Sequence, residues 1–103
     1  MSDTIIVTGT IDLDPAKRDT FIEAAVACMA ATRVEDGNEA YSFSADVEDP
    51  GRFYVTEQWA SQDAIDTHMA TAHLAAFMGT MGAAGVTGAS LTQWNGAEAK
   101  KLM

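Results

Sequence analysis

Cysteine and basic residues are scarce in this chain of 103 residues. The one cysteine is Cys28, so no disulfide can form within the chain. This fits a reducing compartment, and the cytoplasm is the expected location. Lysine and arginine together number 6 against 15 acidic residues, and the formal net charge is −9. Nucleic acids and anionic membrane surfaces attract basic proteins, and we therefore expect neither as a partner.

Long apolar runs and cofactor motifs are missing too. No segment approaches the roughly 18 apolar residues of a membrane-spanning helix, and the opening MSDTIIVTGTIDLDP lacks the basic and apolar regions of a secretory signal. The sequence contains no G-x-G-x-x-G or P-loop motif, no G-x-S-x-G motif and no H-x₃-H pair for a metal. We therefore expect neither secretion nor a membrane span, and the histidines do not have the spacing of a typical metal site.

Hydrophobic periodicity predicts the order of the secondary structure. Alternation predicts strands at 4–13, 39–47, 52–59 and 86–95, while helical spacing predicts one helix after Asp14-Pro15 and two shorter ones after Ser61 and Thr71. On the first helix, the predicted apolar face consists of Phe21, Ile22, Ala25, Val26 and Met29. The order strand, helix, strand, strand, helices, strand is the split βαβ or ferredoxin-like plan of the α+β class. A single domain over residues 1–103 is expected, which buries roughly 65% of its unfolded surface.

One face of the predicted sheet carries mainly neutral polar side chains. On the strand at 4–13 this face holds Thr4, Ile6, Thr8 and Thr10, and the other strands add Ser, Thr, Tyr and Gln. A face exposed to water normally carries lysine and glutamate. We therefore expect this face to be partly buried against a second sheet.

The stretch Arg52–Met81 concentrates the candidate functional residues. On its strand, parity places Glu57 on the same face as Phe53, Val55 and Trp59. Burying an unpaired carboxylate is expensive, so Glu57 is either a site residue or a residue whose head reaches water or an arginine such as Arg33. Arg33 itself could complement the helix dipole, pair with Glu35 or Glu57, or line a pocket.

Both histidines of the chain lie on the predicted apolar faces of the two short helices. His68 follows Ala64 and Ile65 at helical spacing, and His73 precedes Phe77 in the same way. A single inward histidine is more often structural than functional. Two of them beside a glutamate and a tryptophan favour a site for a flat apolar ligand, whose walls would be methionines and aromatic rings.

The segment Thr32 to Met78 resembles the antibiotic biosynthesis monooxygenase-like family, which includes small quinol monooxygenases. The family pattern is R-x-E-x-G, an aromatic strand, D-P, E-x-W, A-x-x-x-H and H-x-x-x-F. The residues that fill it are Arg33, Glu35, Gly37, Tyr41, Pro50, Glu57, Trp59, Ala64, His68, His73 and Phe77. The resemblance implies a homodimer with a shared α+β barrel, and a reaction without flavin or metal. In the reaction that the resemblance implies, a deprotonated quinol reduces dioxygen in a dry pocket, with a histidine as proton acceptor.

The resemblance leads to specific site assignments. The catalytic candidates are His73, near the start of its helix, with His68 in support. The substrate-binding candidates are Glu57, Trp59, Phe77, Met78, Tyr41 and Arg33. Some branches of the family use an asparagine on the first strand, but this chain has asparagine only at positions 38 and 95, which weighs against the haem-degrading branch.

Three classes of function stay open at this point. The first is a cofactor-independent monooxygenase acting with dioxygen on a quinol or polyphenol. The second is an isomerase of a small oxygenated carbonyl compound, which would turn over without oxygen. The third is a dimeric module that binds an apolar ligand without catalysis and tolerates loss of both histidines.

Overall fold

The computed structural model describes residues 2–103 and contains one four-stranded antiparallel sheet with helices on one side. The strand order is β2-β3-β1-β4. This is the predicted ferredoxin-like arrangement of the α+β class, in which the two strands of each βαβ unit have one strand of the other unit between them. The elements are β1 (Ile5–Leu13), a 3₁₀ turn (Pro15–Lys17), α1 (Arg18–Thr32), β2 (Asn38–Ala45), β3 (Arg52–Trp59), α2 (Gln62–Met69), α3 (Ala72–Gly79) and β4 (Val86–Asn95).

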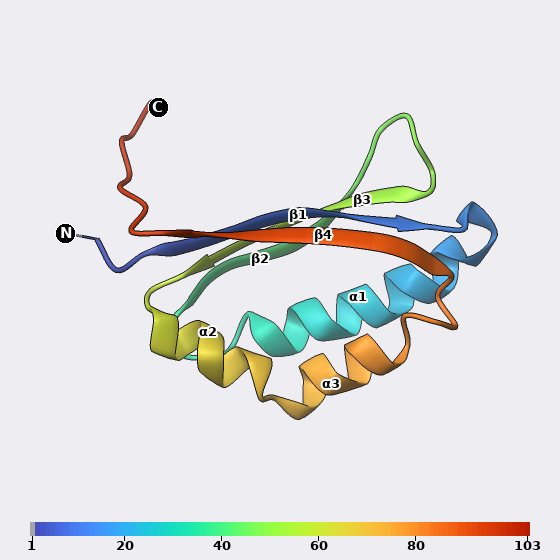
Figure 1. Ribbon diagram of the computed structural model, residues 1–103, viewed down its shortest axis with the longest axis horizontal. Coiled ribbons are helices and arrows are strands. Elements are labelled where there is room, and N and C mark those ends of the chain that lie inside the picture. The colour runs from blue at the N-terminus through green and yellow to red at the C-terminus, as the bar shows by residue number, and fades with distance from the viewer. Residues whose placement is uncertain (1) are drawn as a thin grey trace.

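The two sides of the sheet differ in what they carry. In Figure 1 the three helices lie on one side, while the β2–β3 turn and the C-terminal segment project from the other. Between these projections the second face of the sheet is uncovered by any element of the described chain. No helix among residues 2–103 is long and apolar enough to cross a bilayer.

The predicted helix starts are confirmed by their capping hydrogen bonds. The Ser61 hydroxyl accepts from the backbone N–H of Ala64, and Thr71 does the same for Leu74. Asp14 accepts from the backbone N–H of Ala16, but Pro15 opens a 3₁₀ turn, and α1 begins only at Arg18. The break between Ser61 and Thr71 places the two histidines on separate short helices, His68 at the end of α2 and His73 at the start of α3.

The buried face of α1 differs from the predicted one. Its buried residues are Phe21, Ala25, Cys28 and Thr32, and Val26 is exposed. The prediction that Val26 faces the core is therefore wrong. Five of the fifteen residues of this helix are alanine, and so the sequence offers little contrast between the two sides of the helix.

The second strand is shorter than predicted. It ends at Ala45, and Val47 is exposed in the turn that leads to β3. The Asp46 carboxylate accepts hydrogen bonds from the backbone N–H groups of Glu48 and Asp49, at 3.0 and 2.7 Å. This side chain therefore holds the backbone in a turn where the strand would otherwise continue.

The inner face of the sheet follows the predicted parity. On β3 the buried residues are Phe53, Val55, Glu57 and Trp59. On β1 the glycine Gly9 shares the inner parity, and a Cβ atom there would lie 2.9 Å from the Cα atom of Leu91 on β4. The backbones of β1 and β4 therefore approach closely at Gly9.

Candidate active site

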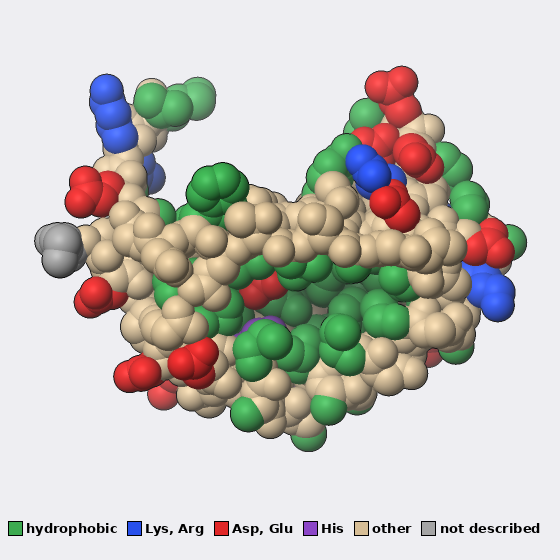
Figure 2. Space-filling model, in the orientation of Figure 1, with side chains coloured by type: hydrophobic (Ala, Val, Ile, Leu, Met, Phe, Trp, Pro, Cys, Tyr) green, Lys and Arg blue, Asp and Glu red, His purple; other side chains and the backbone are tan. Residues whose placement is uncertain are grey.

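A largely apolar cavity of about 380 Å³ lies between the sheet and the helices α2 and α3. We name it the main cavity. Figure 2 shows it as a hollow lined mainly by hydrophobic side chains, with acidic and histidine atoms visible inside. Only two of its lining residues are ionisable at neutral pH, Glu57 and His68. The lining residues are Ile11, Tyr41, Phe43, Val55, Glu57, His68, Met69, Leu74, Phe77, Met78, Met81, Val86, Ala89 and Leu91.

His68 is the histidine that contacts the main cavity. Its side chain is 2% exposed and packs against Trp59, with ring centroids 4.7 Å apart. Its Nδ1 atom lies 2.8 Å from the Oε2 atom of Glu35, and since a carboxylate can only accept, Nδ1 is the donor. The Nε2 atom makes no hydrogen bond within residues 2–103, so the neutral ring has a free acceptor.

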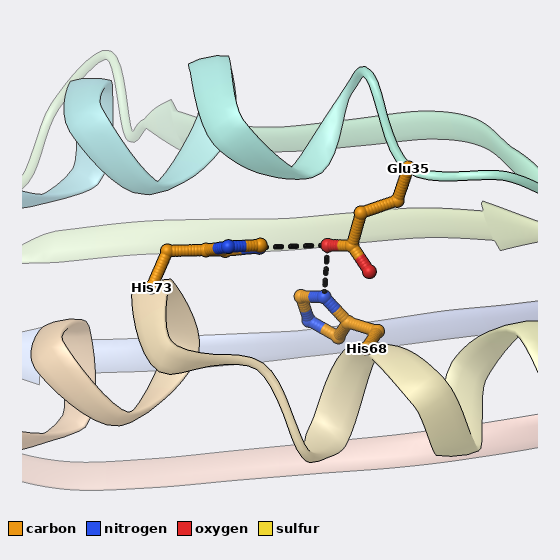
Figure 3. A group of neighbouring side chains, drawn as sticks. All are labelled: Glu35, His68 and His73. Carbon is orange, nitrogen blue, oxygen red and sulfur yellow. Dashed lines mark hydrogen bonds and ion pairs between the residues drawn. The ribbon is translucent and has the colours of Figure 1, made fainter.

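His73 approaches the same oxygen atom of Glu35 as His68 does, as Figure 3 shows. Its Nε2 atom is 2.7 Å from the same Oε2 atom, and its side chain is 28% exposed. It does not line the main cavity but a smaller one of about 190 Å³ between α1 and α3, together with Cys28 and Phe77. His73, the first catalytic candidate, is therefore not among the residues that line the main cavity.

Glu35 is the site residue that the sequence assignments missed. It lies in the turn after α1, and it joins His68 and His73, which are 33 and 38 positions further along the chain. The one signal for it was its place in the R-x-E-x-G pattern. We call Glu35, His68 and His73 the carboxylate–histidine triad. The Oε1 atom of Glu35 is buried and has no hydrogen-bond partner among the described residues.

The triad contains the donor types of a transition-metal site. One atom from each side chain lies within 4.8 Å of the other two. The two nitrogen–oxygen distances, 2.7 and 2.8 Å, are hydrogen-bond lengths. They are shorter than the spacing of about 3.3 Å between ligands around a tetrahedral zinc ion. Shared protons therefore hold the three side chains together in this structure.

Glu57 is a buried carboxylate in the apolar lining, as parity predicted. Its Oε1 atom accepts a hydrogen bond from Nε1 of Trp59 at 2.9 Å. Burial raises its pKa, while the Trp59 hydrogen bond and the nearby His68 act in the opposite direction. The sequence analysis considered an arginine such as Arg33 as its partner, but the hydrogen-bond donor in the structure is Trp59.

Arg33 supports the site from outside the cavity. Its Nε atom donates to the backbone carbonyl of Tyr41 at 2.9 Å, and its terminal nitrogen donates to Ser42. It forms no ion pair with Glu35 or Glu57 within the described chain. The guanidinium thus ties the end of α1 to β2, and the predicted pairing with a glutamate is wrong.

The aromatic candidates lie at different depths. Tyr41 and Phe77 line the main cavity and are buried. Burial raises the pKa of Tyr41, whose hydroxyl lies 3.6 Å from the Cys28 sulfur. Met78 also lines the cavity but is exposed, while Trp59 is fully buried behind His68 and Glu57. Of the eight predicted site residues, the structure brings Tyr41, Glu57, His68, Phe77 and Met78 to one cavity.

The comparison with curated proteins points to one family. A family model described as "Antibiotic biosynthesis monooxygenase" matches residues 4–80. The Bacillus subtilis protein named "Putative monooxygenase YcnE" is 30% identical over 74 residues, which cover 72% of this chain and 78% of that protein.

Solved structures share the whole fold. A crystal structure from Deinococcus radiodurans, described as a "putative antibiotic biosynthesis monooxygenase", matches with a TM-score of 0.88 at 29% identity, covering 96% of this chain and 98% of the other. A protein from Pseudomonas aeruginosa matches with a TM-score of 0.84 at 26% identity, covering 95% and 98%. The chain therefore belongs to the antibiotic biosynthesis monooxygenase family.

Proposed function

We propose that the protein is a cofactor-independent monooxygenase that oxidises a quinol-type aromatic substrate with dioxygen in the main cavity. One observation carries this proposal: His68, oriented by Glu35, lies at an apolar cavity that also holds the buried carboxyl of Glu57. Family membership supports the reaction class.

His68 is the proposed general base. Because its Nδ1 atom donates to Glu35, the lone pair of the neutral ring is on Nε2. That nitrogen accepts the proton of a phenolic hydroxyl group bound in the cavity. The imidazolium that forms is stabilised by the negative charge of Glu35 at 2.8 Å, and so the proton transfer does not leave an unpaired buried charge.

Glu57 is the proposed partner for a second oxygen of the substrate. Its carboxyl accepts a hydrogen bond from Trp59 and can make a second hydrogen bond to a hydroxyl group of the substrate, and burial raises its pKa. A quinol has two hydroxyl groups on one flat ring. The two polar groups of an otherwise apolar cavity match this distribution.

The proposed reaction balances without an external reductant. The quinolate formed by His68 passes one electron to dioxygen, and the resulting semiquinone and superoxide join through a new carbon–oxygen bond. The peroxide then breaks its O–O bond as the ring loses a hydrogen. One oxygen atom stays in the hydroxyquinone, and the other leaves as water with the proton returned by His68. The apolar walls exclude bulk water from these intermediates.

We also propose a homodimer formed through the uncovered face of the sheet. The centre of that face is neutral: Thr8 pairs with Thr56 on one side and with Thr92 on the other. Trp94 is exposed there, and its indole N–H donates to the Thr8 hydroxyl at 3.0 Å. A neutral face with an exposed tryptophan fits a second copy better than it fits water.

Oxygen consumption tests the proposed reaction. Metal-free and flavin-free protein is screened against a panel of hydroquinones in an oxygen electrode, and the product is analysed after reaction with ¹⁸O₂. The expected result is one dioxygen consumed per quinol and one ¹⁸O atom in the quinone. His68→Gln should lose this activity, while the surface variant Glu23→Gln should keep it. Turnover in the absence of oxygen would instead identify an isomerase, and no turnover with any member of the panel would contradict the proposal.

A further inference from the structure

The lining of the main cavity changes from buried to exposed across its width. Tyr41, Glu57 and His68 are at most 6% exposed and form its floor. Met69, Met78 and Leu91 line the same cavity and are 66%, 61% and 51% exposed. These three side chains form the mouth of the cavity. The polar groups that would bind a ring are therefore at the closed end.

The mouth is open because the helices stop short of the edge strand β4. Leu91 faces Gly9 on β1, on the helix side of the sheet, where the residues of β1 and β3 are buried. Leu91 nevertheless is half exposed, since α2 and α3 do not close over it. The hollow of Figure 2 is this gap between β4 and the two short helices. A dimer formed through the opposite face of the sheet leaves the mouth open.

The chemistry of the mouth is uniformly apolar. Neither lysine nor arginine lines the cavity, and its two ionisable residues are both on the floor. Two of the three mouth residues are methionines, whose flexible thioether side chains adapt to ligands of varied shape. Large apolar side chains that are exposed together at the entrance of a pocket mark a surface that a ligand covers.

We propose that the substrate is a quinol that carries an alkyl or prenyl chain, with the ring on the floor and the chain across Met69, Met78 and Leu91. This inference rests on the proposed function for the identity of the ring. It adds the class of substituent, which is apolar and uncharged. An anionic substituent is disfavoured, because the cavity has no cation to pair with it and the protein carries a net charge of −9.

Binding of a chain-length series tests the inference separately from the reaction. Phenols with a para-alkyl chain of zero to eight carbons are titrated into the protein by calorimetry. We expect the dissociation constant to fall about twofold for each methylene until the chain passes the mouth, which is roughly half the effect of full burial. The same chain lengths on hydroquinones should lower KM in parallel.

Polar substitutions at the mouth test whether the gain in affinity per methylene comes from contacts with the mouth residues. Met69→Gln, Met78→Gln and Leu91→Asn keep side-chain size at exposed positions, and each should reduce the gain in affinity per methylene. Val26→Gln is the matched control, since Val26 is a similarly exposed apolar residue on α1. It should keep the wild-type dependence on chain length.

The outcomes separate the two proposals. A dissociation constant that does not depend on chain length overturns the inference, even if short hydroquinones are oxidised. A dependence that survives all three mouth variants, or that Val26→Gln also abolishes, overturns it as well. A chain-length dependence that the mouth variants remove, without oxygen consumption by any quinol, supports the ligand class and contradicts the proposed reaction.

Discussion

The Oε2 atom of Glu35 lies 2.8 Å from the Nδ1 atom of His68, although the two residues are 33 positions apart in the chain. Because the carboxylate accepts the Nδ1 proton, the neutral ring presents Nε2 as its acceptor. Trp59 packs on the same ring and restricts its rotation. Glu35 thus acts as a positioning residue that fixes both the tautomer and the orientation of the proposed base.

Replacing Glu35 with glutamine removes the negative charge of this side chain while keeping its size. The amide has similar size but can turn its NH₂ group toward His68, which favours the other tautomer of the ring. We expect kcat/KM for the best hydroquinone to fall about 10²-fold while the protein stays folded. Oxygen consumption and circular dichroism measure the two effects, and Glu23→Gln on the exposed side of α1 is the control. Unchanged kcat/KM would contradict the positioning role.

The two histidines should contribute unequally, because only His68 contacts the main cavity. We expect His68→Gln to lower kcat/KM by about 10³-fold, and His73→Gln by less than about 10-fold. His73 acts through Glu35, and so its loss should also shift the pH profile of kcat/KM, which a purely structural histidine would leave in place. Equal losses in the two variants, or a larger loss in His73→Gln, would show that the assignment of the base is wrong.

Much of the fold could be predicted because its signals are local. The capping residues Ser61 and Thr71 bind backbone N–H groups within the next turn, and strand parity is decided by neighbours along the chain. The buried side of α1 could not be predicted as well. Its alanines fit either side of a helix, so packing against the sheet decides that Cys28 is buried and Val26 is exposed.

The candidate site could be predicted only in part, for a similar reason. Parity and helical spacing placed Glu57 and His68 on inner faces without any knowledge of the fold. The position of Glu35 depends on an irregular turn after α1, in which the sequence follows neither the helical nor the strand period. Arg33 has a long side chain within reach of several acceptors, and the structure selects the carbonyl of Tyr41 over a carboxylate. Such long-range partners require the tertiary structure.

The burial of Glu57 should make stability depend on pH. Burial raises its pKa above the ordinary value of 4.5, so in the range above 4.5 the folded protein binds more protons than the unfolded chain. The corresponding stabilisation is fully present below pH 4.5 and is lost as the pH rises through the folded-state pKa.

Glu57→Gln should remove this dependence, because glutamine still accepts from Trp59 and never ionises. We expect the variant to be more stable than the wild type at pH 8 by about 1 kcal/mol, and the difference to shrink toward pH 4.5. Urea unfolding at a series of pH values measures it, with Glu23→Gln as the exposed control. A difference that stays constant, or that grows as the pH falls, would show that the pKa of Glu57 is not raised in the folded state.

The uncovered face of the sheet should hold the dimer together. Thr56 lies at its centre, paired with Thr8 on one side and Ser42 on the other, and none of these side chains is charged. Light scattering at low micromolar concentration should therefore give twice the chain mass of 10.9 kDa.

Thr56→Lys places a charge on this face of each copy, and the two lysines must be desolvated close together if the copies associate. We expect dissociation at least about 10²-fold easier than in the wild type, because juxtaposed like charges cost several kcal/mol. Thr20→Lys on the exposed side of α1 makes the same substitution away from the sheet and should stay dimeric. A wild-type monomer, or a Thr56→Lys variant that dimerises as well as Thr20→Lys, would show that the second face of the sheet is exposed to water in solution.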